Sequence, residues 1–100
     1  MPYRNRKLLD LAMDQACVMC GAMDGTVVSA HSNLQEHGKG MGQKADDSMT
    51  AWLCYRCHSR LDHGSDMTKQ ERRDFTLTAI CRTVNQLWQQ ELIRIRSGKD

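Results

Sequence analysis

The sequence has few aromatic residues and no long apolar run. Of its 100 residues, only 5% are aromatic, although 40% are hydrophobic in the broad sense. A core with so few large side chains is thin for a chain of this length, and a bound metal would help to stabilise it. No stretch approaches the roughly 20 consecutive apolar residues of a transmembrane helix. The basic start of the chain also lacks the apolar core of a signal peptide. We therefore expect one small domain over residues 1–100 that contacts no membrane.

The chain also lacks a strong excess of charge and an even number of cysteines. Its formal net charge is +2 and its pI is about 8.3. This mild basicity is compatible with nucleic-acid binding but does not by itself indicate it. Five cysteines in a chain without a secretion signal argue against a disulfide framework. They indicate a reducing, cytoplasmic compartment.

Short elements are predicted for the first two thirds of the chain. Residues 5–15 have the apolar spacing of a short amphipathic helix. Residues 26–30 and 50–54 are typical of short strands, and the glycine-containing segment 34–50 between them is typical of a loop. The sequence CHSRLDH then predicts a helix, which we expect Gly64 to end in a left-handed conformation.

The last third of the chain predicts one long helix over 68–96. Thr68 and Glu71 have the spacing of a capping box, which marks its start. Apolar residues then recur at three- and four-residue steps over about five turns. This apolar stripe comprises Leu77, Ile80, Val84, Leu87, Trp88, Leu92 and Ile95. We interpret the stripe as core, with a homodimer interface as the alternative, and Cys81 as a small buried apolar residue.

Four of the five cysteines form two CxxC pairs, Cys17 with Cys20 and Cys54 with Cys57. Two such pairs supply the four thiolates of a closed, tetrahedral structural zinc site. The long interval between them must contain strand, loop and strand, so that a hairpin returns the chain to the first pair. A redox role is the alternative, but redox CxxC pairs normally occur singly in a βαβ unit, and none is evident.

The histidines predict a second centre. His58 directly follows the second cysteine pair and is free if four sulfurs bind the zinc; a Cys₃His site that includes it is the alternative. Asp62 lies four residues further along the same helix face. His31 ends the first predicted strand. We expect the hairpin to bring His31, His58 and either Asp46 or Asp47 around one cleft. Such ligands suit Mg²⁺, Mn²⁺ or Zn²⁺, and an imidazole nearby can accept a proton from water.

The order of these motifs resembles the HNH endonucleases, also called ββα-metal or His-Me finger endonucleases. The motifs are 17-CVMC-20, 29-SAHSN-33, 45-ADD-47 and 54-CYRCHSRLD-62. More narrowly, the chain is similar to a family of small nucleases of lambdoid phages and prophages. The resemblance covers roughly residues 4–63 and, more loosely, the C-terminal helix. It implies an α+β fold in which a zinc-knuckle-bearing, treble-clef-like ββα-metal core at 16–64 is flanked by a short N-terminal and a long C-terminal helix.

The resemblance also implies roles for individual residues. His31 takes the position of the general base, and Asp47 that of a central polar residue. His58 matches the histidine that binds the catalytic divalent ion, Mg²⁺ or Mn²⁺, and the four cysteines match a structural zinc site. Ala30 departs from the pattern, because many HNH proteins have a metal-binding aspartate or histidine there. Asp47, Asp62, or water and a substrate phosphate must then hold the ion.

These residues lead to three hypotheses of function. The first is a metal-dependent DNA endonuclease of phage DNA processing or recombination. Four basic residues, Lys39, Lys44, Arg56 and Arg60, are expected to contact backbone phosphates without reading sequence. The second hypothesis is a non-catalytic zinc-finger module that binds nucleic acid, which Ala30 favours. The third is a zinc-stabilised interaction or dimerisation module built on the long helix.

Overall fold

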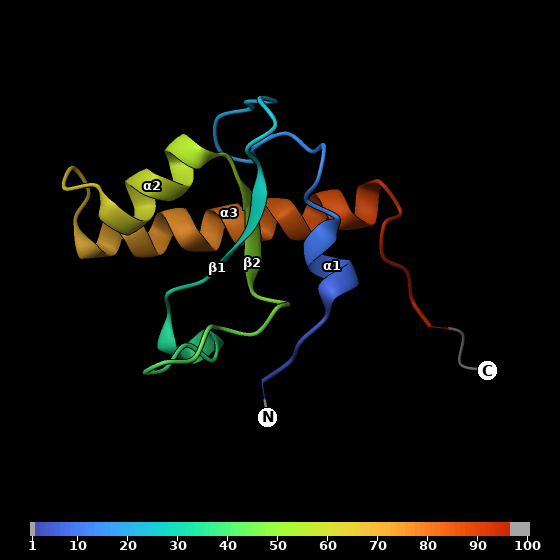
Figure 1. Ribbon diagram of the computed structural model, residues 1–100, viewed down its shortest axis with the longest axis horizontal. Helices are drawn as coiled ribbons and strands as arrows, with labels where there is room; N and C mark the ends of the chain where they lie inside the picture. The colour runs from blue at the N-terminus through green and yellow to red at the C-terminus, as the bar shows by residue number, and fades with distance from the viewer. Residues whose placement is uncertain (1, 97–100) are drawn as a thin grey trace.

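The computed structural model describes residues 2–96 and has a small α+β fold (Figure 1). In chain order its elements are α1 (Arg6–Asp10), β1 (Val28–His31), the 3₁₀ turn η1 (Gln35–His37), β2 (Thr50–Leu53), α2 (Tyr55–His63) and α3 (Lys69–Gln89). The predicted α+β class and the order strand, strand, helix are confirmed. In Figure 1, α3 runs the length of the molecule behind the hairpin, and α2 lies alongside the first half of α3.

The two strands form an antiparallel hairpin in which His31 is opposite Thr50 and Val28 is opposite Leu53. Both are shorter than predicted. β1 begins at Val28, and the side-chain oxygen of Thr26, before the strand, accepts a hydrogen bond from the backbone N–H of Tyr55. Cys54 is the N-cap of α2 and not the last residue of β2, because its carbonyl already accepts the N–H of His58.

The second strand, β2, lies at the centre of the core, and all four of its residues are buried. The main chain of Trp52 is bonded outside the hairpin on both sides. Its N–H donates to the hydroxyl of Thr83 on α3 over 2.9 Å, and its carbonyl accepts the N–H of Val18 over 3.0 Å. These two bonds satisfy strand groups that would otherwise be orphaned in the core. They also attach α3 and the first cysteine pair to the hairpin.

The first helix is shorter than the predicted 5–15, because α1 ends at Asp10. Asn5 caps its start by accepting the N–H of Leu8. The chain then turns, and Asp14 takes a left-handed conformation with φ of 66°. That backbone geometry cannot continue a right-handed helix.

The prediction that Gly64 ends α2 in a left-handed conformation was wrong. Its φ is −67° and its backbone is extended. A Cβ atom at this position would lie 2.6 Å from the carbonyl oxygen of Arg60. Glycine is therefore needed here for a close approach of two backbone segments and not for a positive φ.

The predicted capping box of Thr68 and Glu71 is present at the start of α3. The helix nevertheless ends at Gln89 and not at 96. Glu91 takes a φ of 55°, and the N–H of Leu92 donates back to the carbonyl of Leu87, which is the bonding of a helix-terminating turn. The turn folds Leu92 and Ile93 back against the core. None of the described helices, α3 included, has both the length and the apolar character needed to cross a membrane.

The buried face of α3 differs from the predicted stripe. Ile80 and Leu87 are buried as expected. The rest of the buried face consists of small or hydroxyl-bearing residues, namely Thr76, Ala79 and Thr83. Trp88 and Ile95 are exposed, and so is Cys81, which we expected to be buried. The crossing of α3 over β2 explains the preference for small residues, since they allow the helix to approach the strand closely.

Candidate metal centre and candidate active site

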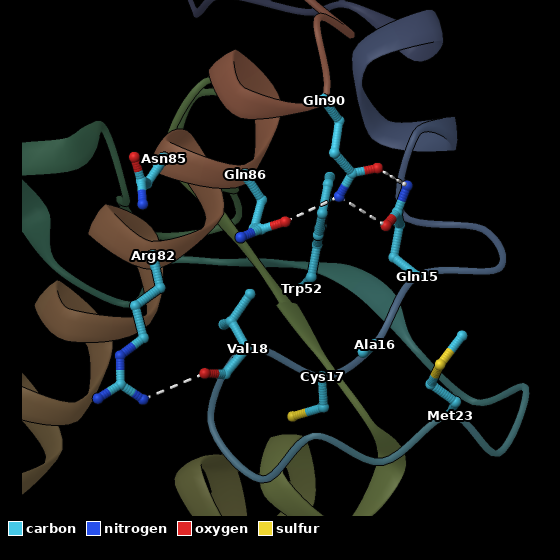
Figure 2. Close-up of a pocket in the computed structure, with 10 residues that line it drawn as sticks. All are labelled: Gln15, Ala16, Cys17, Val18, Met23, Trp52, Arg82, Asn85, Gln86 and Gln90. Carbon is cyan, nitrogen blue, oxygen red and sulfur yellow. Dashed lines mark hydrogen bonds between the residues drawn. The ribbon is translucent and has the colours of Figure 1, made fainter.

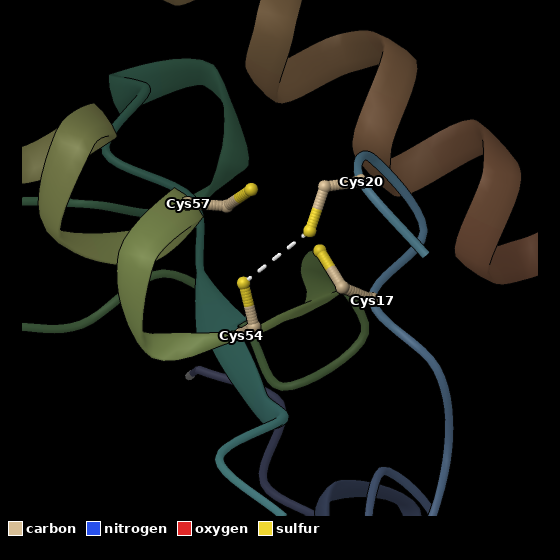
Figure 3. Close-up of side chains that lie close together, drawn as sticks. All are labelled: Cys17, Cys20, Cys54 and Cys57. Atoms are coloured by element: carbon tan, nitrogen blue, oxygen red, sulfur yellow. Dashed lines mark hydrogen bonds between the residues drawn. The ribbon is translucent and has the colours of Figure 1, made fainter. Parts of the chain in front are cut away.

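The four paired cysteines meet at one point, as their spacing predicts (Figure 3). Cys17 and Cys20 come from the turn before β1, and Cys54 and Cys57 come from the start of α2. All four Sγ atoms lie within 4.8 Å of one another, and those of Cys20 and Cys54 are 3.6 Å apart. A tetrahedral ion with metal–sulfur bonds of ~2.3 Å separates its sulfurs by about 3.8 Å, whereas a disulfide needs about 2.05 Å. The cluster is positioned to hold a metal ion and is consistent with structural zinc.

Backbone hydrogen bonds and burial change the pKa values of the cysteines in this cluster. Burial opposes ionisation of Cys17, but nearby backbone N–H groups, first that of Cys54, outweigh it and lower the pKa of Cys17 to about 7. Burial and the neighbouring sulfurs, first that of Cys20, raise the pKa of Cys57. Thiolates this close repel one another, so a bound cation is needed to keep all of them ionised.

His58 takes no part in the cysteine cluster, so the Cys₃His alternative is not required. It lies in the first turn of α2, and its Nε2 atom is 3.1 Å from a carboxylate oxygen of Asp62. The other oxygen of Asp62 accepts a hydrogen bond from Asn33, just beyond β1. The histidine beside the second cysteine pair thus belongs to a separate polar network that links α2 to the end of the first strand.

His31, the last residue of β1, forms a second and more buried pair. Its Nε2 atom lies 2.8 Å from Oδ1 of Asp47. The Asp47 side chain is only 5% exposed, and its Oδ2 accepts the backbone N–H of Asn5 over 2.7 Å. Burial favours the neutral acid, but the hydrogen bonds from His31 and Asn5 and the positive charges of protonated His31 and of Arg4 outweigh it and lower the pKa of Asp47. A buried carboxylate anion therefore faces the imidazole.

This pairing determines which nitrogen of His31 carries the proton. An ionised carboxylate can only accept hydrogen bonds, so Nε2 of His31 must be the donor to Asp47. In the neutral imidazole the other nitrogen, Nδ1, is then unprotonated and can accept a proton. Both oxygens of Asp47 are engaged by donors, which does not fit the expected role of this residue as a ligand of a catalytic ion. Asp47 orients His31 instead.

The N-terminal segment completes this site, which the sequence analysis missed. Arg4 spreads its guanidinium over the loop before β2, with donor–acceptor distances of 2.8 Å to the carbonyl of Ala45 and 3.1 Å to that of Lys44. A third contact, of 3.4 Å, reaches Asp47. Arg4 and Asp47 are 43 residues apart in the sequence. No local sequence pattern predicts a contact between residues so far apart. The basic residues at the start of the chain were the one feature that could have indicated it.

His31 lines an open groove of about 390 Å³ between α1 and the first strand. Two cations line it as well, Lys44 and Arg6, of which only Lys44 was predicted. His58 and Asp62 are not among its lining residues. Within residues 2–96, the four cysteines are the one group of three or more potential metal ligands that gathers within 4.8 Å. The expectation that His31, His58 and either Asp46 or Asp47 come together around one cleft is therefore not met, because His58 does not line the groove of His31.

The other predicted basic residues lie away from this groove. Lys39 is half-buried in the loop, and Arg56 is exposed on α2. Arg60 pairs with Asp66 over 2.9 Å. The second acidic candidate, Asp46, accepts the N–H of Tyr3 and does not pair with His31. Of the predicted phosphate contacts, Lys44 is thus the one that shares a groove with His31.

Comparison of the chain with protein-family models, with curated proteins and with solved structures gives no match.

Proposed function

We propose that the protein is a metal-dependent DNA endonuclease that hydrolyses phosphodiester bonds, with His31 as its general base. The observation that carries the proposal is the buried, ionised Asp47, which holds His31 so that Nδ1 is free. His31 also opens on a groove that contains two cations. The motif resemblance to small nucleases of lambdoid phages and prophages supports a role in phage DNA processing or recombination.

The proposed chemistry begins with a water molecule beside His31. Nδ1 of His31 accepts a proton from the water, and the water oxygen forms a bond to phosphorus as the bond to the leaving 3′-oxygen breaks. Asp47 stabilises the imidazolium that forms, because it carries the opposite charge at 2.8 Å. Arg6 and Lys44 are positioned in the groove to neutralise phosphate charge.

The motif resemblance leaves His58 and Asp62 to offer nitrogen and oxygen ligands to a divalent ion; they pair with each other over 3.1 Å and lie outside the lining of the His31 groove. Two protein ligands suit Mg²⁺ or Mn²⁺, since such ions are commonly completed by water and substrate phosphate. When bound, the ion would supply charge neutralisation at the phosphoryl group and the leaving oxygen. Ala30 offers no ligand, so His58 and Asp62 carry this role in the proposal.

We further propose that the four cysteines bind a structural Zn²⁺ ion and that the core is a treble-clef-like ββα-metal fold. The four sulfurs come from the turn before the hairpin and from the helix after it. One ion would therefore hold together the start of β1 and the end of β2, at the end of the hairpin opposite His31. None of the five cysteines is joined in a disulfide within the described chain, which suits a reducing compartment such as the cytoplasm.

The test is a nicking assay on supercoiled plasmid, with zinc content verified for each protein. Wild type and His31→Ala are compared in Mg²⁺, in Mn²⁺ and without added divalent ion. We expect wild type alone to nick, and only with added ion. Equal nicking by both proteins would show a contaminant. If wild type cuts no form of DNA, including single-stranded and branched substrates, the proposal is wrong.

One observation favours the second candidate, a non-catalytic nucleic-acid-binding module. Outside the cysteine cluster, residues 2–96 contain no gathered set of three metal ligands, and Ala30 cannot supply one. This candidate predicts DNA binding that weakens as salt rises, with no cleavage. It also predicts that His31→Ala leaves the affinity unchanged.

A further inference from the structure

A pocket of about 460 Å³ lies on the side of the molecule where α3 passes the first cysteine pair (Figure 2). Val18 and Met23 supply apolar surface, and Trp52, which is only 2% exposed, lies beneath the lining. Figure 2 shows amide side chains from α3 and from the turn after α1 around it. The lining residues are Gln15, Ala16, Cys17, Val18, Met23, Trp52, Arg82, Asn85, Gln86 and Gln90. Its size and mixed lining are those of small-ligand sites. The proposed nuclease chemistry uses none of its polar side chains.

The amides of this pocket are oriented by one another. Gln15 and Gln90 exchange two hydrogen bonds of 3.2 and 3.1 Å, and Gln90 also donates to Gln86 over 2.9 Å. The NH₂ group of Gln86 therefore donates no hydrogen bond within residues 2–96. The side-chain amide of Asn85, which also lines the pocket, makes no hydrogen bond within these residues either. No carboxylate lines the pocket. Neutral amides over an apolar surface suit a flat, neutral ligand with both donors and acceptors on its edge, which describes a nucleobase.

The pocket is connected to the groove of His31 by a smaller hollow. This hollow, of about 170 Å³, shares Val27 with the His31 groove and shares Gln15 and Met23 with the amide pocket. The three depressions therefore follow one another over the surface. Met23 is 72% exposed on this path, and flexible thioether side chains adapt well to apolar faces.

We propose that this path binds a single strand and that the amide pocket takes one unpaired nucleobase. The proposal deepens the proposed nuclease function and rests on it for the choice of nucleic acid as ligand. Asn and Gln are the side chains that pair with base edges, and stacking on apolar surface is tolerant of sequence.

Charged residues along the path suit the binding of a strand with a phosphate backbone. Arg6 and Lys44 lie at the His31 end and Arg82 lies at the amide pocket. Asp10 also lines the His31 groove, where it pairs with Arg6 over 3.2 Å, and Asp14 lines the connecting hollow. Each end of the path therefore offers a cation to a backbone phosphate, and the base in the amide pocket would lie beside Arg82.

The test measures binding of a short fluorescein-labelled single strand, by anisotropy, without divalent ion. Asn85→Ala and Gln86→Ala are compared with wild type and with Gln89→Ala, a control at an exposed position of α3 outside the pocket. Loss of one base contact should weaken single-strand binding about tenfold in the two pocket variants. Binding to Gln89→Ala and the melting temperature of all three variants should stay at the wild-type values.

A second readout reports on the pocket itself. The chain has two tryptophans, so Trp88→Phe leaves Trp52 as the one fluorophore of this kind. We expect the single strand to change Trp52 fluorescence in Trp88→Phe, and we expect the same change to require about tenfold more strand when Asn85→Ala is added.

The inference is overturned if the pocket variants bind the strand as tightly as wild type, or if Gln89→Ala loses as much affinity. It is also overturned if an unstructured peptide changes Trp52 fluorescence and the strand does not, since the pocket then takes peptide. Because binding is measured without cleavage, a protein that nicks no DNA but shows the selective loss would keep the base pocket and remove the nuclease proposal.

Discussion

The Nε2 atom of His31 lies 2.8 Å from Oδ1 of Asp47, although 16 positions of sequence separate the two residues. β1 supplies the histidine, and the loop that leads into β2 supplies the aspartate. Asp47 is in turn held by the N-terminal segment. The site therefore depends on three separate segments of the chain, and each segment can be tested.

Replacing Asp47 with asparagine should slow nicking while leaving the fold intact. The amide keeps the shape but removes the charge that orients His31 and stabilises its protonated form. Since general-base catalysis contributes about 10²- to 10⁴-fold, we expect a loss within that range, and His31→Ala should be at least as slow. The rate constant for plasmid nicking is the measurement. Asp46→Asn is the matched control, and an equal loss there would contradict an orienting role for Asp47.

Replacing Arg4 with alanine should disturb His31 without any direct contact between the two. Arg4 binds the carbonyls of Ala45 and Lys44 and approaches Asp47, so its loss frees the segment that presents Asp47. Nitrogen chemical shifts of the imidazole report the tautomer, and we expect a mixture in place of one form. Arg4→Lys should restore little, because an ammonium cannot span several acceptors as the planar guanidinium does. An unchanged tautomer in Arg4→Ala would refute this positioning role.

Asp47 should contribute to stability at neutral pH and lose that contribution in acid. Its pKa is lower in the folded chain than its usual value of about 4 in an unfolded one. The folded state thus gains from the ionised form above pH ~4, and this gain disappears as the pH falls through the lower folded pKa. Urea unfolding of wild type and Asp47→Asn at several pH values measures the difference. The two proteins should converge toward low pH, and a constant difference would contradict the assignment. The comparison is made over the pH range in which both proteins keep their metal, because thiolate sites lose it in acid.

Removal of the metal should unfold much of the domain. Structural zinc contributes on the order of 10 kcal/mol in small domains, and the core here has few large buried side chains. We expect one zinc per wild-type chain by elemental analysis and loss of helical circular dichroism on chelation. Cys54→Ser should lose the ion, whereas Cys81→Ser, an exposed cysteine outside the cluster, should keep it. An unchanged spectrum after the zinc has been stripped would rule out the structural role.

The predicted homodimer through the C-terminal helix is best tested at Trp88. Leu87 is buried in the core of the monomer, so a charge there would unfold the chain whatever its oligomeric state. Trp88 is 47% exposed on the same helix. If the helix mediates dimerisation, Trp88→Asp should convert a dimer to a monomer in sedimentation velocity, and Gln89→Ala should not. A wild-type protein that sediments as a monomer at every concentration would remove this proposal.

The sequence alone determined the cysteine cluster and the start of α3. The spacing of the cysteines predicts a metal site, because two residues between a pair of thiolates allow both to reach one ion. The four cysteines are Cys17, Cys20, Cys54 and Cys57. Thr68 and Glu71 are equally local, since a capping box joins residues three positions apart. The hairpin could also be predicted, because the chain between the two cysteine pairs must return to the same metal ion.

The tertiary structure decided the ends of the helices and the surroundings of His31. α3 stops at Gln89 because the core receives Leu92 and Ile93, although the apolar repeat continues in the sequence. Asp47 became a buried partner of His31 because the N-terminal segment folds over it, and Asn5 and Arg4 supply the donors. Local propensity and ligand spacing act over a few residues and can be read from the sequence. Burial and ionisation depend on groups that meet only after the chain has folded.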